Sequence, residues 1–206
     1  MIRPCLLFVP FLLSLGISWA DTTATPLSFP EDGGILDVTH FGAVPDDDGD
    51  DTAAIQKAID QHPSGNRIIF LPAGTYVVRD TLRWAGTTNG NAQKRTILQG
   101  AGESLSILKL PDHTKGFSDN ETKALIWTGT KPAQRFRNAI RDLTIEIGSG
   151  NRSAIGLQFN ASNQGCIRNV TIRAEKDSGK IGLDLGFTDE IGPLLVRHLT
   201  VEGFEI

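Results

Sequence analysis

The sequence predicts an all-β fold of the solenoid type, in which short strands stack in successive coils, and three observations support this prediction. Nearly the same octet occurs three times, as IRDLTIEI (residues 140–147), IRNVTIRA (167–174) and VRHLTVEG (196–203). The offsets between its copies are 27 and 29 residues. A shorter motif, Ile-Gly-Leu, falls between them at residues 155–157 and 181–183. The one convincing helix pattern precedes all of these repeats.

The segment before the repeats contains a short strand, a helix and two pairs of strands. Residues 35–38 are predicted as a strand, and a helix follows that Asp51 or Thr52 would cap. Its apolar stripe consists of Ala54, Ile55, Ala58 and Ile59. RIIFLPAGTYVV then predicts two strands around the turn at residues 71–74. A further pair, 96–99 and 106–110, flanks the turn at residues 100–102.

The three octets share their chemistry column by column when they are aligned. The first, fourth and sixth positions are always apolar, the second is always Arg and the fifth is always Thr. We therefore expect a strand with one buried face, rebuilt in every coil at the ordinary strand spacing of about 4.8 Å. Ala124 to Trp127 is predicted as a degenerate earlier copy of the Ile-Gly-Leu strand. A β-propeller or β-sandwich is the alternative, but the repeats lack the Asn-Gly hairpin turns expected there.

Composition and the N-terminal segment indicate the class of partner and the location of the protein. The 206 residues carry a formal net charge of −4, without the basic excess of a nucleic-acid-binding protein. Residues 1–20 are predicted as a signal peptide, with Arg3 before an apolar run and a Ser-Trp-Ala end. Residues 21–34 follow as an extended lead-in, and residues 35–206 form the solenoid domain. We therefore expect a secreted protein, extracellular or periplasmic, without membrane association after cleavage.

The segment before the repeats also resembles a known family. DVTHFGAVPDDDGDDTAAIQKAI (37–59) and IIFLPAGTYVV resemble the N-terminal signature of the pectate lyase superfamily, in the branch shared by rhamnogalacturonases, polygalacturonases and epimerase-like proteins. The resemblance implies a right-handed parallel β-helix with a short N-terminal capping helix. It also implies a polysaccharide substrate, such as pectin or rhamnogalacturonan, cleaved by glycosidic hydrolysis or β-elimination. The alternative is a non-catalytic carbohydrate-binding or surface-attachment β-helix.

The sequence departs from the family's hydrolases in its catalytic motifs. Their Asn-Thr-Asp, Asp-Asp, Gly-His-Gly and Arg-Ile-Lys motifs are absent from the repeats. The chain ends at Ile206, directly after a predicted strand, so we expect the catalytic coils to lie in a continuation of the chain. If the chain stops there, we expect the open end to assemble with a partner or with itself.

Three carboxylates near the end of the chain are the candidate catalytic residues: Asp184, Asp189 and Glu190. Such carboxylates would serve as acid and base in glycoside cleavage, or would hold Ca²⁺ in a lyase. The competing interpretation is that they are solvated loop acids. The acidic run at residues 46–51 lacks the EF-hand pattern, and the four His residues lack metal-ligand spacing, so no metal site is predicted.

The Arg residues in the second octet column are the candidate substrate-binding residues: Arg141, Arg168 and Arg197. Three guanidinium groups at coil spacing would form a track for uronate carboxylates, since Arg binds a carboxylate as a bidentate fork. The competing interpretation is a solvated wall whose charge is balanced by neighbouring acidic residues, namely Asp142, Glu146 and Glu202. The sequence leaves both interpretations open.

Four Asn-x-Ser/Thr sequons occur, at Asn120, Asn151, Asn160 and Asn169. They would accept glycans in a eukaryotic secretory pathway. The sequence does not decide between glycosylation and a structural role.

Overall fold

The structure is a computed structural model that describes residues 28–30, 33–61, 65–84, 95–130, 136–188 and 191–206. The predicted signal peptide and most of the predicted lead-in lie outside these ranges, so both stay predictions. Within the ranges described, no helix combines the length and the apolar character needed to cross a membrane.

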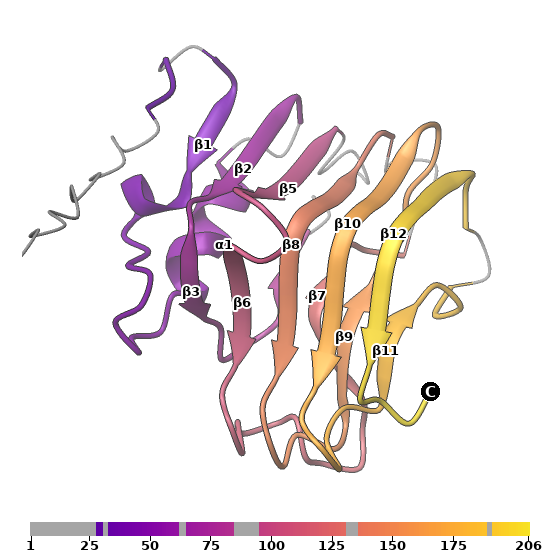
Figure 1. Cartoon of the computed structure of the whole chain (residues 1–206). Coiled ribbons are helices and arrows are strands. Elements are labelled where there is room, and N and C mark those ends of the chain that lie inside the picture. The colour runs from indigo at the N-terminus through magenta and orange to yellow at the C-terminus, as the bar shows by residue number, and fades with distance from the viewer. Residues whose placement is uncertain (1–27, 31–32, 62–64, 85–94, 131–135, 189–190) are drawn as a thin grey trace, which may run out of the picture.

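The strands form two parallel sheets, A and B, and from β2 onward the chain passes from one to the other in every coil (Figure 1). Sheet A contains β1 (Ile35–Asp37), β2 (Arg67–Leu71), β5 (Thr96–Gly100), β8 (Ala139–Ile147), β10 (Gly165–Ala174) and β12 (Leu194–Glu202) in this order. In the same sheet β6 (Ser106–Leu110) pairs with β8, and β3 (Gly74–Val77) pairs with β6. Sheet B contains β4 (Leu82–Arg83), β7 (Lys123–Trp127), β9 (Ala154–Gln158) and β11 (Ile181–Asp184). The predicted right-handed parallel β-helix is confirmed.

The repeats stack in the register that the sequence predicts. Ile140 of β8 pairs with Ile167 of β10, which pairs with Val196 of β12. In sheet B, Ala124 pairs with Ile155, which pairs with Ile181, so the degenerate copy in β7 is also confirmed. The predicted strands at residues 96–99 and 106–110 pair with neighbouring coils rather than with each other.

The octet contains a bend at its third position, which corrects the interpretation of a regular strand. Asp142, Asn169 and His198 have φ angles of 58°, 53° and 51°, in the left-handed region. Asp, Asn and His are the non-glycine residues that adopt this region most readily. The bend shifts the strand's alternation by one residue, which is why the apolar positions are the first, fourth and sixth. In earlier coils the same place separates β2 from β3 and β5 from β6.

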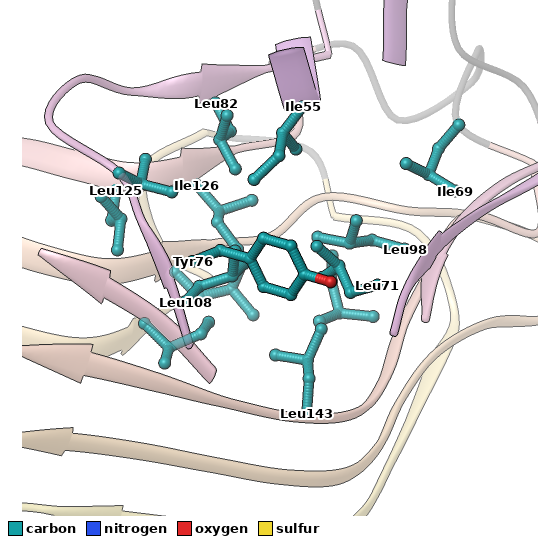
Figure 2. Close-up of a cluster of buried hydrophobic side chains, with 14 of the residues drawn as sticks. Ile55, Ile69, Leu71, Tyr76, Leu82, Leu98, Leu108, Leu125, Ile126 and Leu143 are labelled. Atoms are coloured by element: carbon teal, nitrogen blue, oxygen red, sulfur yellow. The ribbon is translucent and has the colours of Figure 1, made fainter. Parts of the chain in front are cut away.

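The apolar columns form the core inside the coils. In β8 and β10 the six side chains of the three apolar octet columns are fully buried: Ile140, Leu143, Ile145, Ile167, Val170 and Ile172. Figure 2 shows Tyr76 among the leucines of neighbouring coils, with its hydroxyl donating to the carbonyl of Pro72 at 3.2 Å. Burial raises the pKa of Tyr76 far above its ordinary value, so the phenol stays neutral.

The N-terminal end of the coil stack carries a 3-10 helix, η1 (Val38–Phe41), and α1 (Thr52–Asp60) (Figure 1). Asp51 occupies the N-cap position of α1 as predicted, but its side chain makes no capping hydrogen bond. The carboxylate of Asp51 is buried and accepts from the backbone N–H groups of Val44 and Val77, at 2.8 and 2.9 Å. The Thr52 hydroxyl accepts from the N–H of Arg79 at 2.8 Å. Both side chains therefore fasten the start of α1 to the segment around β3.

The glycine of the Ile-Gly-Leu repeat lies directly against neighbouring strands of both sheets. A Cβ atom on Gly156 would lie 2.5 Å from Cγ2 of Ile172 and 2.8 Å from the carbonyl oxygen of Gly182. The Gly182 oxygen belongs to the backbone, so a movement of side chains alone would not remove the clash. The glycine therefore repeats because the stacked coils leave no room for a side chain.

Candidate functional site

The last residues of four sheet B strands form a continuous row that we call the sheet B row: Arg83, Trp127, Gln158 and Asp184. Each pairs in register with the next, from β4 through β7 and β9 to β11. Arg83 is exposed and the other three are half-buried. Because every coil contributes one side chain, the row runs along the solenoid and crosses its coils.

Direct contacts hold the row together at both ends. The guanidinium carbon of Arg83 lies 5.7 Å from the centre of the Trp127 ring, a cation–π geometry. Gln158 Nε2 donates to Asp184 Oδ2 at 3.0 Å, and the N–H of Gly186 donates to Asp184 Oδ1 at 2.9 Å. The carboxylate of Asp184 is therefore oriented by a side chain of the preceding coil and by its own turn.

The sheet B row has the chemistry of a sugar-binding surface. The apolar face of a pyranose ring packs against an aromatic ring, and Trp127 is such a ring. The amide of Gln158 and the carboxylate of Asp184 provide donors and acceptors for sugar hydroxyls beside it. The row thus combines an aromatic platform with polar groups that fix orientation, as carbohydrate sites require.

Sequence reasoning found one member of this row and missed three. Asp184 was predicted as a catalytic candidate, whereas Arg83, Trp127 and Gln158 were not. The aligned Ile-Gly-Leu motifs already place Gln158 opposite Asp184, so the signal was present in the repeat. Asp189 and Glu190 lie outside the described residues, and the acid–base role of all three carboxylates stays a prediction.

The three candidate arginines lie on sheet A in one register column, which we call the Arg column: Arg141 on β8, Arg168 on β10 and Arg197 on β12. Nη2 of Arg168 lies 3.8 Å from Oδ2 of Asp142, and Nε of Arg197 lies 3.4 Å from Nε2 of His198. Nε of Arg141 is buried and has no hydrogen-bond partner. The structure thus aligns the column as predicted, and its role in binding substrate stays a prediction.

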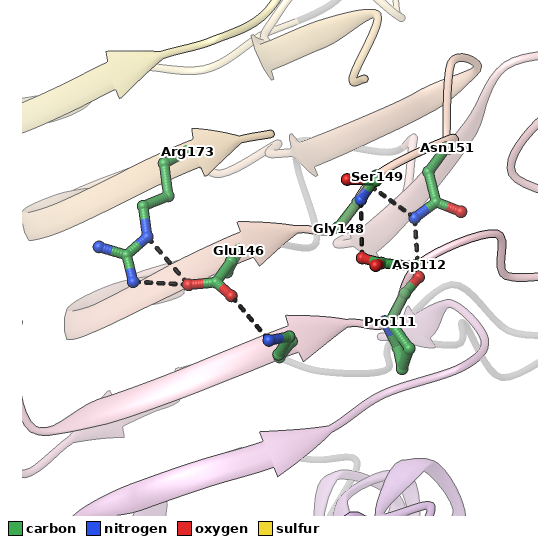
Figure 3. A network of polar contacts seen from close by, with 8 residues as sticks. Pro111, Asp112, Glu146, Gly148, Ser149, Asn151 and Arg173 are labelled. Carbon is green, nitrogen blue, oxygen red and sulfur yellow. Dashed lines mark hydrogen bonds and ion pairs between the residues drawn. The ribbon is translucent and has the colours of Figure 1, made fainter. Parts of the chain in front are cut away.

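The acidic residues expected to balance the Arg column do not all serve it. Glu146 instead pairs with Lys109 at 3.2 Å and with Arg173 at 2.5 Å (Figure 3). Burial raises the pKa of Glu146, but its ion pairs and hydrogen bonds with Arg173 and Lys109 outweigh burial and hold it below the ordinary value. Glu202 stands opposite Arg173 in the register. Of the three predicted counter-charges, only Asp142 reaches the Arg column.

Asn151 fastens two turns at the edge of the coils, beside the ion pairs of Glu146 (Figure 3). Its Nδ2 donates to the carbonyls of Pro111 and Gly148, at 2.8 and 2.9 Å. Its Oδ1 accepts from the N–H of Thr114 at 2.9 Å. The Asn151 side chain is fully buried, as is that of Asn160. Both side chains are therefore inaccessible in the folded chain, and that of Asn151 has a structural role.

Comparisons with known proteins agree with this architecture. The family model described as rhamnogalacturonase A/epimerase, pectate lyase-like, matches residues 35–206. Two mannuronan C5-epimerases of Azotobacter vinelandii, AlgE3 and AlgE1, are 33% and 32% identical over 145 and 143 residues. Each alignment covers 66% of this chain. The chain spans only 7% of AlgE3 and 10% of AlgE1.

Two solved structures share the fold at low sequence identity. ORF18 of Geobacillus virus E2 superposes with a TM-score of 0.54 at 22% identity, covering 73% of this chain and 27% of that one. The Agl-KA catalytic domain superposes with a TM-score of 0.51 at 18% identity, covering 88% and 35%. Since the family model matches the whole solenoid, the chain belongs to the rhamnogalacturonase A/epimerase family of pectate lyase-like proteins.

Proposed function

We propose that this chain belongs to a secreted protein that binds an acidic polysaccharide along the sheet B row and acts on its uronate units. The observation that carries the proposal is the row itself, where an aromatic ring, an amide and an oriented carboxylate stand on successive coils. A linear polymer would lie across the coils and contact all of them.

The proposed reaction begins with removal of the proton at C5 of a uronate. The curated relatives are named mannuronan C5-epimerases, which supports this choice over direct hydrolysis. If the proton returns to the opposite face, the sugar is epimerised without bond cleavage. If the C4–O bond breaks instead, β-elimination leaves a C4=C5 double bond and frees the chain beyond it. Asp184 would bind and orient the sugar, since both of its oxygens are held by hydrogen bonds.

A binding role without turnover is the second candidate, and one observation favours it. Gln158 and the N–H of Gly186 occupy one oxygen each of Asp184, which suits a fixed acceptor better than a proton shuttle. In that case the sheet B row would attach the protein to a polysaccharide that it does not alter.

Polymannuronate and polygalacturonate binding would test the proposal, with wild type compared to Trp127→Ala and Asp184→Asn. Loss of a stacked aromatic ring should weaken binding about tenfold or more. Lys57→Ala, on the exposed face of α1, serves as the control and should bind like wild type. If Trp127→Ala and Asp184→Asn both bind like wild type, the sheet B row is not the site.

Product analysis then separates the reactions. β-Elimination produces ultraviolet absorbance from the new double bond, and hydrolysis produces reducing ends without it. Epimerisation changes the proton NMR spectrum of the polymer at constant chain length. Polymer that is bound but unchanged in all three assays would establish the binding role.

A further inference from the structure

We propose that the Arg column on sheet A is a second binding surface, which holds the carboxylates of a uronate polymer independently of the sheet B row. The column consists of Arg141, Arg168 and Arg197, which stand opposite one another in register on β8, β10 and β12. It lies on a different sheet from Trp127 and Asp184, so the two surfaces share no residue.

The Arg column carries an energetic cost in the folded chain. Like charges placed directly opposite on neighbouring strands destabilise a sheet. The parallel register holds the three arginines at successive strand positions, about 4.8 Å apart. The fold therefore concentrates positive charge along a line that runs across the coils.

Negative charge that could balance the Arg column is scarce among the described residues. Among the described residues, Asp142 is the one carboxylate paired with the column, at 3.8 Å from Arg168, and it also accepts from Asn169 Nδ2 at 2.7 Å. Arg197 Nε donates to His198 Nε2, and an imidazole carries no negative charge. Glu146 is engaged by Lys109 of β6 and by Arg173 of β10.

Two arginines of β10 differ in the hydrogen bonds that they make. Arg168 and Arg173 are on the same strand and have nearly equal side-chain exposure, 45% and 44%. Arg173 makes two hydrogen bonds to Glu146, at 3.0 and 2.5 Å, whereas Arg168 makes none to Asp142. The donors of Arg168 therefore remain available to an external carboxylate, which an Arg fork binds with two parallel bonds.

The ligand class follows from the spacing of the arginines and rests on the proposed function. A polymer with one carboxylate per sugar offers anionic groups at an interval close to one strand spacing, so neighbouring arginines would engage successive or alternate sugars. A uronate polymer bound to the sheet B row would extend beyond it and would present further carboxylates to the Arg column. The Arg column would hold the polymer while another part of it occupies the sheet B row, which raises the effective concentration there.

Equilibrium binding of polygalacturonate by the double variant Arg168→Gln/Arg197→Gln tests the proposal. Two exposed charge pairs are lost, so binding should weaken about tenfold and depend less on salt. Arg173→Gln is the matched control and should bind within about twofold of wild type. The double variant should unfold at the same temperature as wild type or higher without ligand, because repulsion is relieved.

The comparison is repeated in the Trp127→Ala background, so that a failure of the sheet B proposal is seen separately. Arg-dependent binding that persists there supports a second surface. Fully methyl-esterified polygalacturonate, which lacks the charge, should bind weakly and without any dependence on Arg168 and Arg197. The proposal is overturned if the double variant binds like wild type, if Arg173→Gln loses as much affinity, or if single-stranded DNA binds as tightly as polygalacturonate.

Discussion

Replacing Asn151 with Ala should destabilise the chain severely, although the residue is polar and belongs to a sequon. Truncation removes an amide that is fully buried and makes three hydrogen bonds. Of its three partners, the Pro111 carbonyl keeps a hydrogen bond from the Thr114 hydroxyl at 2.8 Å. The Gly148 carbonyl and the Thr114 N–H lose their bond to the amide in a buried setting.

The magnitude follows from these two orphaned groups. Each buried group left without a partner costs about 1–3 kcal/mol, so the free energy of unfolding should fall by about 2–6 kcal/mol. Asn151→Asp should do at least as much damage at neutral pH, because it faces a carboxylate toward two carbonyl oxygens. Urea denaturation followed by circular dichroism measures both variants, with Asn120→Ala as the exposed control.

The control should change the free energy of unfolding by no more than about 0.5 kcal/mol. A loss below about 1 kcal/mol for Asn151→Ala would refute the reasoning, since the turns around residues 111–114 and 148–151 would then close without the amide. A glycan found on Asn151 in folded protein would refute it equally, because the amide nitrogen is inaccessible in this structure.

Three further predictions concern charge, packing and modification. Glu146→Gln should lower stability by about 1 kcal/mol at neutral pH. Because folding lowers the pKa of Glu146, this contribution is present above the unfolded pKa and is lost as pH falls through the folded pKa. Denaturation at pH 7 and pH 3 should therefore show a smaller difference between the two proteins in acid, and an equal difference at both would contradict the ion pairs. Gly156→Ala should cost about 1–3 kcal/mol through its contact with Ile172, measured by thermal unfolding; an unchanged Tm would mean that the sheets separate easily. Expression in a eukaryotic secretory system should give glycan on Asn120 and none on the buried sequons, as peptide mass spectrometry would reveal.

The coil architecture was predictable because stacking imposes the same demand on each coil. Every copy of the octet must bury its apolar columns against the next, so the sequence repeats and the register can be deduced from it. Ile140, Ile167 and Val196 align in the structure as they do in the sequence. The left-handed bend was also encoded, since an apolar spacing of three and then two residues cannot come from a regular strand.

The roles of individual polar residues were not predictable, because they depend on partners far away in the sequence. Asp51 is a favoured residue type for a helix N-cap and lies at that position, yet its carboxylate accepts from the N–H of Val77, 26 residues later. Glu146 was expected to balance the charge of the Arg column, yet it forms its ion pairs with Lys109 and Arg173. In each case the side chain had several chemically reasonable partners, and the packing of the coils selected one.

The difference between constant and variable columns separates structural from functional candidates in a solenoid. Hydrogen bonds explain two members of the constant Thr column. Thr144 donates to the carbonyl of Glu103 and Thr171 donates to its carboxylate, so the loop that contains Glu103 is held to two coils. In the sheet B row the stacked positions hold Trp127, Gln158 and Asp184, which stacking alone does not require. The Arg column is constant like the Thr column, but it lacks the internal partners that explain the threonines. A repeated residue that the fold does not satisfy calls for a partner outside the fold, and this is the reasoning that the Arg168→Gln/Arg197→Gln variant tests.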